Sequence, residues 1–315
     1  MKPRTLAVLS GGVGGSRLVQ GLCQVLSDTE ITVVVNTGDD FVHWGLHVSP
    51  DIDTVLYTLS GIGDGERGWG LAYETFNAMA MMSRYGGEAW FRLGDGDLAT
   101  HVMRTEALRR GATLTEVTRR QAQGLDVQAH VVPMTDDRLQ TFLDTMEGEL
   151  SLQDYLVRYG ARPVVKRIFF CGDATATPEV CAALAQASAV VIAPSNPYVS
   201  IDPILHVRGV RSLLGEKPVV AVSPIVAGRA IKGPLATMIE ALEGCAPSAA
   251  AIASHYGSLL DGMVVERGDG AAIGGTLRTL ETTTVMGTPS SRRQLARDVL
   301  TLVDDIVGTG HLVEG

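Results

Sequence analysis

Short apolar runs alternate along the chain with segments of helical periodicity. The apolar runs are rich in Val, Ile and Ala, a composition typical of strands that are buried on both faces of a sheet. Between these runs, apolar positions recur every three or four residues, as they do in amphipathic helices. This alternation predicts β-α-β units and therefore a mostly parallel sheet.

The two patterns together predict the individual elements. Strands are expected at Thr5–Ser10, Ile31–Asn36, Val164–Cys171, Ala189–Ala193, Pro218–Val222 and Met263–Glu266. Helices are expected at Ser16–Leu26, Thr75–Tyr85, Ala99–Arg110, Pro178–Gln186, Leu235–Leu242 and Ser291–Ile306. The predicted fold class is α/β, with a Rossmann-like, mostly parallel sheet in a three-layer αβα core.

The segment from about 111 to 160 departs from this rhythm. The stretch TLTEVTRRQAQGLDVQAHVVPMTDD reads as a polar helix or strand, followed by a short strand that ends at Met134. We interpret the segment as a smaller inserted α+β subdomain that leans over the carboxyl edge of the sheet and the active site. The whole chain, 1–315, is expected to form a single α/β domain around it.

Composition and charge exclude several classes of protein. The net charge of −9 argues against a nucleic-acid partner, which requires a basic face. The most apolar tract, AALAQASAVVIAP, falls short of the roughly 20 residues of a membrane span, and the first apolar run is too short for a signal peptide. Four cysteines without a C-x-x-C pair indicate reduced thiols. A cytoplasmic location is expected.

A glycine-rich turn follows the first predicted strand. In LSGGVGGSR, four glycines (Gly11, Gly12, Gly14 and Gly15) precede a helix, so backbone N–H groups and the helix N-terminus favour a phosphate there. The stretch is not G-x-G-x-x-G, because Arg17 takes the last position, and no P-loop lysine follows. The alternative is a turn that only packs helix on strand. We interpret these glycines as substrate-binding residues for an anion.

Four aspartates follow the second predicted strand. In NTGDDFVHWGLHVSPDIDT they are Asp39, Asp40, Asp51 and Asp53. Beside a bound phosphate they would repel it, at a cost of about 4 kcal/mol for each pair of like charges 4 Å apart. A divalent cation reverses that repulsion, and Mg²⁺ suits carboxylates combined with phosphate oxygens. All four are therefore candidate metal ligands; the alternative is a solvated acidic loop in which Asp51 caps a helix.

Three further loops carry candidate substrate contacts. In RLGDGDLATH, Arg92 could reach a phosphate, and Asp97 is expected to cap the following helix. The turns APSNPYVSIDP and VSPIVAGRAIKGP leave later strands, and either could instead be an ordinary connector. Their candidate binding residues are Ser195, Asn196, Gly228, Arg229 and Lys232.

The order and spacing of these strings are more specific than any one of them. SGGVGGSR, VNTGDD, GLHVSPDIDTVLYTLSG, WGLAYETF, RLGDGDLATH, PMTDD, APSNPYVSIDPIL and VSPIVAGRAIKGP occur in series over essentially the whole chain. In this respect the chain resembles the 2-phospho-L-lactate transferase family (CofD, called FbiA in actinobacteria). Members of that family act in the biosynthesis of the deazaflavin coenzyme F-420.

The resemblance implies a Mg²⁺-dependent transfer between two small molecules. The donor is a guanosine diphosphate ester of a three-carbon acid (lactyl, enolpyruvyl or glyceryl). The acceptor is Fo, a deazaflavin whose ribityl hydroxyl attacks the phosphorus that bears the acid, so that GMP leaves. The glycine turn and the loop with Arg229 and Lys232 would hold the guanosine diphosphate. A homodimer is also implied.

The resemblance also suggests catalytic residues. The second aspartate of the S-P-D-x-D-T motif contacts Fo in the family, and here it is Asp53. Arg92 stands where family members often carry Lys, so the charge is kept while the geometry becomes a planar fork. We assign catalytic roles to Asp53, Asp40 and Arg92.

Two other functions fit parts of the sequence. A nicotinamide-dependent dehydrogenase would explain the glycine-rich turn, but the broken G-x-G-x-x-G pattern counts against it. A CofD-like regulatory protein that binds nucleotide sugars is the second alternative. The intact SPDIDT and LGDGDLATH motifs favour the transferase.

Overall fold

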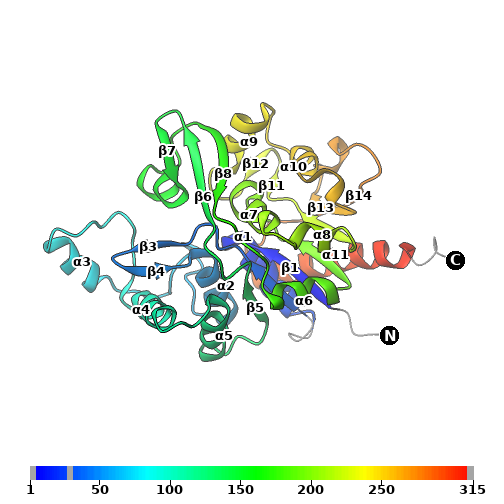
Figure 1. Cartoon of the computed structure of the whole chain (residues 1–315). Coiled ribbons are helices and arrows are strands. Elements are labelled where there is room, and N and C mark those ends of the chain that lie inside the picture. The colour runs from blue at the N-terminus through cyan, green and yellow to red at the C-terminus, as the bar shows by residue number, and fades with distance from the viewer. Residues whose placement is uncertain (1–4, 27–30, 311–315) are drawn as a thin grey trace.

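Seven parallel strands form the centre of the molecule (Figure 1). The computed structural model describes residues 5–26 and 31–310. The strand order is β14-β13-β10-β9-β1-β2-β5, and every neighbouring pair in this sheet is parallel. The strands are β1 (Leu6–Ser10), β2 (Ile31–Val35), β5 (His130–Pro133), β9 (Ala189–Ile192), β10 (Val219–Val222), β13 (Gly262–Glu266) and β14 (Arg278–Thr282).

Helices cover both faces of this sheet because each central strand is apolar on both sides. In β1, for example, Leu6 and Val8 face one hydrophobic core while Ala7 and Leu9 face the other, as the alternation of a strand requires. One face packs against α1 (Gly12–Cys23), α2 (Pro50–Ser60), α5 (Leu114–Gly124) and α11 (Pro289–Gly310). The other packs against α6 (Pro178–Gln186), α7 (Asp202–His206), α8 (Val210–Leu214), α9 (Leu235–Glu243) and α10 (Ala249–Tyr256). The predicted α/β class, with three layers, is confirmed.

A second sheet rises above the main one in Figure 1. It consists of β6 (Gln140–Thr145), β7 (Gly148–Ser151) and β8 (Val165–Cys171), and all its pairings are antiparallel. The predicted strand Val164–Cys171 therefore forms, but it lies outside the parallel sheet. The burial of the strand reflects the difference, since Val165 is its only buried residue, whereas a strand in the centre of a parallel sheet is buried on both faces.

The segment 111–160 is divided between the two sheets. Its α5 helix and β5 strand belong to the main sheet, where β5 pairs with β2 at the edge, and only its later part enters the small antiparallel sheet. The predicted short strand ending near Met134 thus forms, as β5 of the main sheet. The division of the chain into a domain and an inserted subdomain remains a prediction.

Two elements project from the side of the sheet that carries the small sheet's hairpins and α4 (Asp95–Arg109) (Figure 1, left). They are α3 (Asn77–Arg84) and the hairpin of β3 (Phe41–His43) and β4 (Leu46–Val48). The remaining elements are the short hairpin β11 (Ile225–Val226) and β12 (Arg229–Ala230), π-helical turns at Asp154–Arg158 and Pro197–Ile201, and 3-10 turns at Gly257–Leu259 and Gly270–Ala272.

Parallel strands bring the candidate loops to one edge. The glycine-rich turn follows β1, the four-aspartate stretch follows β2, and the Ser195 turn follows β9. These three strands are direct neighbours in the order β9-β1-β2, so the loops meet at the carboxyl edge, where open α/β sheets bind their ligands.

Among the helices of the described residues, none combines the length and the apolar character that a bilayer crossing requires.

Candidate active site

The glycine-rich turn binds the two neighbouring loops through its backbone. The Gly12 N–H, at the start of α1, donates to Oδ1 of Asp51 over 2.6 Å, and the Gly11 N–H donates to Oγ of Ser195 over 3.0 Å. A Cβ at Gly11 would lie 2.6 Å from Oδ2 of Asp51, so only glycine permits this approach. Part of the helix N-terminus predicted to bind phosphate is thus used by the protein's own carboxylate.

Three aspartates of the acidic stretch lie together, and we call them the loop carboxylates: Asp39, Asp40 and Asp51. The Nδ2 group of buried Asn36 donates to Asp39 Oδ1 (3.3 Å) and to Asp51 Oδ2 (2.9 Å). Within the described residues neither aspartate forms an ion pair with a Lys or Arg side chain. The sequence prediction that the acidic stretch gathers negative charge at this edge is therefore matched by the geometry.

Asp40 has a different environment from the other two. Its Oδ2 accepts hydrogen bonds from Ser49 Oγ (2.7 Å) and from Nε2 of His47 (3.0 Å). Its Oδ1 is buried and has no hydrogen-bond partner in the structure. A buried acceptor without a partner is costly in protein interiors, and it marks this oxygen as the one open to a ligand.

Burial shifts the titration of all three loop carboxylates. Loss of solvation raises the pKa of Asp39 well above its usual range, and the charges of Asp51 and Asp40 raise it further. Burial raises the pKa of Asp51 to about 6, although hydrogen bonds from Asn36 and Gly12 oppose the shift. Burial also raises the pKa of Asp40. The group is electrostatically short of positive charge.

Asp53 belongs to a separate cluster, which we call the Arg104 network: Tyr57, Asp53, Asp97, His101 and Arg104. Arg104 lies on α4 and is fully buried, and its guanidinium forms a fork on Asp53, from Nη1 to Oδ2 over 3.1 Å and from Nη2 to Oδ1. The Nδ1 atom of His101 lies 3.7 Å from Asp53 Oδ2. One full positive charge thus faces the carboxylate that the family resemblance singles out.

Asp97 completes this network. Contrary to the sequence prediction, its side chain does not cap α4. Its Oδ1 accepts the hydroxyl of Tyr57 over 2.7 Å and lies 3.4 Å from Nε2 of His101. Burial opposes ionisation, but His101, the hydrogen bond from Tyr57 and the charge of Arg104 together outweigh it and lower the pKa of Asp97. Glu74 caps the helix instead, since its carboxylate accepts the N–H groups of Gly96 and Asp97.

His101 and Arg104 were absent from the sequence prediction. They lie one turn apart on α4, about 50 positions after Asp53, in a helix that reads as ordinary and polar. The usable signal was the Asp97–His101 spacing, which places both side chains on one helical face, but only the fold shows that α2 packs against that face.

Other predicted residues lie at the edge of this arrangement. Arg92 is exposed, and its guanidinium lies 4.4 Å from the ring centre of Phe76. Lys232 donates to the carbonyl of Arg67 over 3.3 Å, and its pKa is lowered by burial and by the charge of Arg17. In the part of the chain that the structure describes, neither Arg92 nor Lys232 forms an ion pair with the aspartates. Their substrate-binding roles remain predictions.

The turns after β9 and β10 are built in different ways. Ser195 is buried, and its hydroxyl also bonds the carbonyl of Gly11 over 3.1 Å. The Asn196 side chain accepts the N–H of Tyr198 over 3.0 Å and so caps the following π-helical turn. Gly228 has a positive φ of 73° within the β11–β12 hairpin, and Arg229 is exposed next to it. Ser195 is thus joined to the glycine-rich turn, whereas Arg229 faces solvent.

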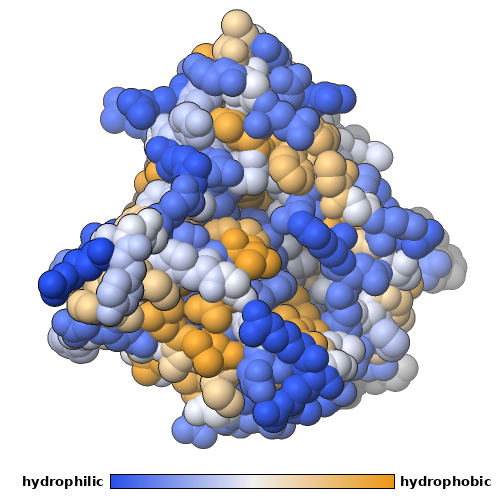
Figure 2. Space-filling view, turned by 60° about the vertical axis from the view of Figure 1, so that its left-hand side comes forward, coloured by the Kyte–Doolittle hydropathy of each residue, from blue (hydrophilic) through white to orange (hydrophobic). Residues whose placement is uncertain are grey.

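Aromatic side chains gather directly after the loop carboxylates. The ring centres of Phe41 and Phe91 lie 4.8 Å apart, and those of His43 and Trp90 lie 5.5 Å apart. His43 is buried, and its Nε2 has no hydrogen-bond partner. Figure 2, which turns α3 and the β3–β4 hairpin forward, shows apolar residues in orange on this side of the molecule. Between residues 42 and 103, eight large apolar side chains are exposed: Val42, Ile62, Trp69, Tyr73, Met81, Tyr85, Val102 and Met103.

Metal-binding geometry is most compact in the Arg104 network. Among the described residues, one group of three His, Cys, Asp or Glu side chains has its ligand atoms within 4.8 Å of one another, namely Asp53, Asp97 and His101. The guanidinium of Arg104 lies against the same carboxylate, which disfavours a divalent cation at that place. Among the loop carboxylates, Asp39 and Asp51 form no ion pair with a cationic side chain of the described residues, whereas Asp40 lies beside His47 and feels the charge of Arg104.

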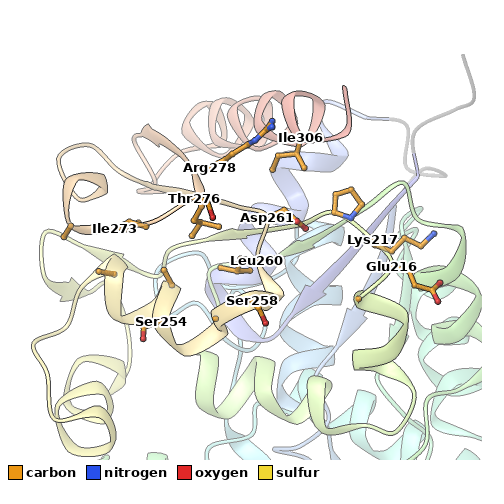
Figure 3. Close-up of a pocket in the computed structure, with 18 residues that line it drawn as sticks. Glu216, Lys217, Ser254, Ser258, Leu260, Asp261, Ile273, Thr276, Arg278 and Ile306 are labelled. Carbon is orange, nitrogen blue, oxygen red and sulfur yellow. The ribbon is translucent and has the colours of Figure 1, made fainter. Parts of the chain in front are cut away.

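A large cavity lies away from these loops. It has a volume of about 960 Å³ and follows the amino ends of β10, β13 and β14, at the edge opposite the candidate site (Figure 3). The two cationic side chains that line it already bind backbone carbonyls: Lys217 donates to that of Ala185, and Arg278 donates to that of Asp305. Its chemistry points to no ligand.

The chain is similar to known proteins over nearly its whole length. Residues 6–282 match the family model "2-phospho-L-lactate transferase CofD". A phosphoenolpyruvate transferase from Streptomyces coelicolor is 39% identical over 317 residues, which cover 96% of this chain and 98% of the relative. A 2-phospho-L-lactate transferase from Methanospirillum hungatei is 35% identical over 298 residues, covering 94% and 99%.

A solved structure shares the fold. The crystal structure of a UPF0052-family protein from Bacillus halodurans superposes with a TM-score of 0.64 and covers 95% of this chain and 99% of that one, at 18% identity. The family match and the two transferases extend over nearly the whole length of the chain. The chain belongs to the 2-phospho-L-lactate transferase CofD family.

Proposed function

We propose that this protein transfers a phospho-three-carbon-acid group from a guanosine diphosphate ester to the terminal ribityl hydroxyl of Fo. The product is coenzyme F-420-0 or its dehydro form, and the leaving group is GMP. The observation that carries the proposal is the joining of the glycine-rich turn to the loop carboxylates through Gly12 and Asp51. A diphosphate held at that turn lies next to carboxylates that lack a cation.

The donor's diphosphate is proposed to lie along the remaining N–H groups at the start of α1. The dipole of the helix favours an anion there, and Lys232 and Arg17 supply positive charge nearby. These two cations now hold backbone carbonyls of the segment 65–67, from which a phosphate could displace them. Exposed Arg229 is a candidate contact for the guanosine part.

Magnesium fits the chemistry of the loop carboxylates. Asp40 offers a buried oxygen without a partner, and burial raises the pKa of both Asp39 and Asp51. We propose that these three hold the ion, with Asp53 at the border of the group. When bound, Mg²⁺ would neutralise the charge on the transferred phosphate.

The acceptor is proposed to approach from the side of the aromatic group around Phe41. A flat deazaflavin ring suits aromatic neighbours, and this places its ribityl chain toward Asp40 and Asp53. The ribityl oxygen forms a bond to the phosphorus that carries the acid, the bond from that phosphorus to the GMP oxygen breaks, and the hydroxyl proton is released. Asp53 accepts a hydrogen bond from the attacking hydroxyl. Positioning and charge neutralisation supply most of the rate in such transfers.

The test is a transfer assay with defined donors. The protein is incubated with Fo, Mg²⁺ and the guanosine diphosphate ester of enolpyruvate, lactate or glycerate, and the products are identified by mass. The enolpyruvyl donor is the first choice, because the Streptomyces relative is named for it. Formation of GMP together with an Fo adduct is expected. No adduct with any donor, combined with a rise of the thermal midpoint by a UDP-sugar, would favour a binding protein. Light scattering would check the homodimer that we also expect.

A further inference from the structure

Arg104 has no exposed surface. It is the only arginine among the largest fully buried side chains of the described residues. A buried guanidinium is costly unless it is paired with excellent geometry, and apolar residues of similar volume often stabilise a fold as well or better. Its Nε atom has no hydrogen-bond partner. A contribution to the stability of the fold therefore does not explain why an arginine is buried at this position.

The guanidinium itself is held from three helices. It forms the fork on Asp53 of α2, its Nη2 donates to Oε1 of Gln121 on α5 over 3.1 Å, and its own backbone lies on α4, where Nδ1 of His101 is 3.4 Å from Nη1. Groups placed on rigid elements and supported from behind keep their geometry better than groups on loops. The fork thus fixes the plane of the Asp53 carboxylate.

The fork leaves acceptor positions on Asp53 free. A carboxylate has about four lone-pair positions, and Arg104 uses one on each oxygen. Both oxygens can still accept a hydrogen bond from a substrate hydroxyl, in a direction that the guanidinium sets. Lys in place of Arg would keep the charge but lose the bidentate geometry.

We propose that Arg104 is a positioning residue of the transfer reaction, acting through Asp53: its bidentate fork orients the Asp53 carboxylate toward the attacking ribityl hydroxyl. This inference rests on the proposed function. Arg104 itself touches neither substrate, and its effect reaches the reaction only through the carboxylate.

A double-mutant cycle tests the proposal. Wild type, Arg104→Lys, Asp53→Asn and the double variant are each assayed below their own thermal midpoint for kcat, for KM of the donor and for affinity for Fo, read from the fluorescence of its ring. Arg104→Lys is expected to lower kcat by about 10-fold to 100-fold, the range that a misplaced reacting group produces, with KM of the donor within about threefold. In the Asp53→Asn background the same change should lower kcat less than about threefold, because interacting residues are not additive.

Two controls separate positioning from stability. Val299→Ala removes buried volume from α11, which contributes no residue to the Arg104 network or to the loop carboxylates, and should lower the thermal midpoint with kcat unchanged. Arg110→Lys changes an exposed arginine of the same region, paired with Glu106, and should change neither quantity.

The outcomes are distinct. Wild-type kcat in Arg104→Lys overturns the proposal, and so do additive effects of the two substitutions. A loss of kcat that only follows the thermal midpoint overturns it too. If the wild type binds Fo but transfers nothing, the proposed function fails, while the cycle of Fo affinities still decides on Arg104: a weaker affinity in Arg104→Lys that vanishes in the Asp53→Asn background supports it, and an unchanged affinity contradicts it.

Discussion

The loop carboxylates and the Arg104 network lie at the same edge of one sheet, yet they hold negative charge in opposite ways. Burial raises the pKa of Asp51 to about 6 in the first group. In the second, Asp97 is also buried, but its pKa is lowered because His101, Tyr57 and Arg104 together outweigh the cost of burial. The pKa values of the two buried aspartates therefore differ because their neighbouring side chains differ, not because one is more deeply buried.

This contrast separates two uses of an aspartate. A carboxylate whose cation is built into the fold, as Arg104 is for Asp53, has its counter-charge and its orientation fixed by neighbouring helices. A buried group of carboxylates without a cation is unstable by itself and gains most from a metal ion. The sequence placed all four aspartates in one metal site, whereas the structure gives Asp53 a partner of its own.

The largest effect is expected from removing the metal. A chelator should abolish transfer, and Mg²⁺ should restore it, because the loop carboxylates otherwise repel the donor's diphosphate. Mg²⁺ should also raise the thermal midpoint of the free protein, an effect that Asp40→Asn should reduce. Turnover at the full rate in excess chelator would sink the magnesium proposal, and a wild-type midpoint that ignores Mg²⁺ would contradict binding at the loop.

Asp53→Asn should produce the next largest effect. Asn replaces Asp well in the first turn of a helix, so a simple helix-terminal role predicts little change. Here the substitution leaves the guanidinium of Arg104 buried without its counter-charge, which costs roughly 3–5 kcal/mol of unfolding free energy in comparable pairs. It should also lower kcat roughly 100-fold or more.

Urea unfolding and GMP release on the same preparation measure both effects. The matched control is Asp173→Asn, in an exposed pair with Arg208, where neither quantity should change appreciably. Near-wild-type values for Asp53→Asn would erase the distinction between the two groups.

Much of the fold could be predicted from the sequence because each central strand is apolar on both faces. The strands β1, β2, β9, β10 and β13 were found in this way. The pattern failed where the physics differs. β14 lies at the edge of the sheet and is partly polar, and β8 belongs to a half-exposed antiparallel sheet, whose membership depends on partners distant in the chain.

The candidate site was predictable only as far as local signals reach. The acidic stretch and the glycine-rich turn follow strands directly, so parallel topology brings them together. Arg104 and Asp97 carry no such signal. Whether a helical arginine is solvated or buried against an aspartate about 50 positions earlier depends on how α2 and α4 pack, and the periodicity of either helix alone does not determine that.

Gly12→Ala sharpens the comparison from the side of the backbone. An added Cβ would lie 3.1 Å from Oδ1 of Asp51, close enough to move the loop carboxylate by a few tenths of an ångström, while the Arg104 network has no contact with it. We expect the Mg²⁺ concentration for half-maximal rate to rise about 3-fold to 10-fold, within the range of metal-site support residues. Gly124→Ala, at a helical position with open space, is the control. Equal Mg²⁺ dependence in both variants would contradict the role of Gly12.

The smallest effect is expected in a third network, whose cation is a histidine that loses its charge when the pH rises. His255 lies 3.0 Å from Oδ2 of Asp202 and 3.3 Å from Oε1 of Glu243, neither of which belongs to the loop carboxylates or to the Arg104 network. Burial opposes its charge, but these two carboxylates raise the pKa of His255 above the ordinary value of 6.5. The rings of Tyr198 and Tyr256 complete its surroundings. Because the folded pKa is the higher one, the stabilisation is fully present below pH 6.5 and is lost as the pH rises through the folded pKa.

The measurement is the free energy of unfolding of wild type and of His255→Gln, obtained in urea at a series of pH values. The difference between the two proteins should be about 1 kcal/mol larger at pH 5.5 than at pH 9, the size expected of a partly exposed ion pair. Neither Arg nor an exposed Lys titrates between these pH values, so Arg110→Lys, at an exposed pair with Glu106, should show no comparable step. A difference curve for His255→Gln that is flat, or that rises toward high pH, would mean that His255 is neutral in the folded protein and that its two carboxylates are stabilised by other means.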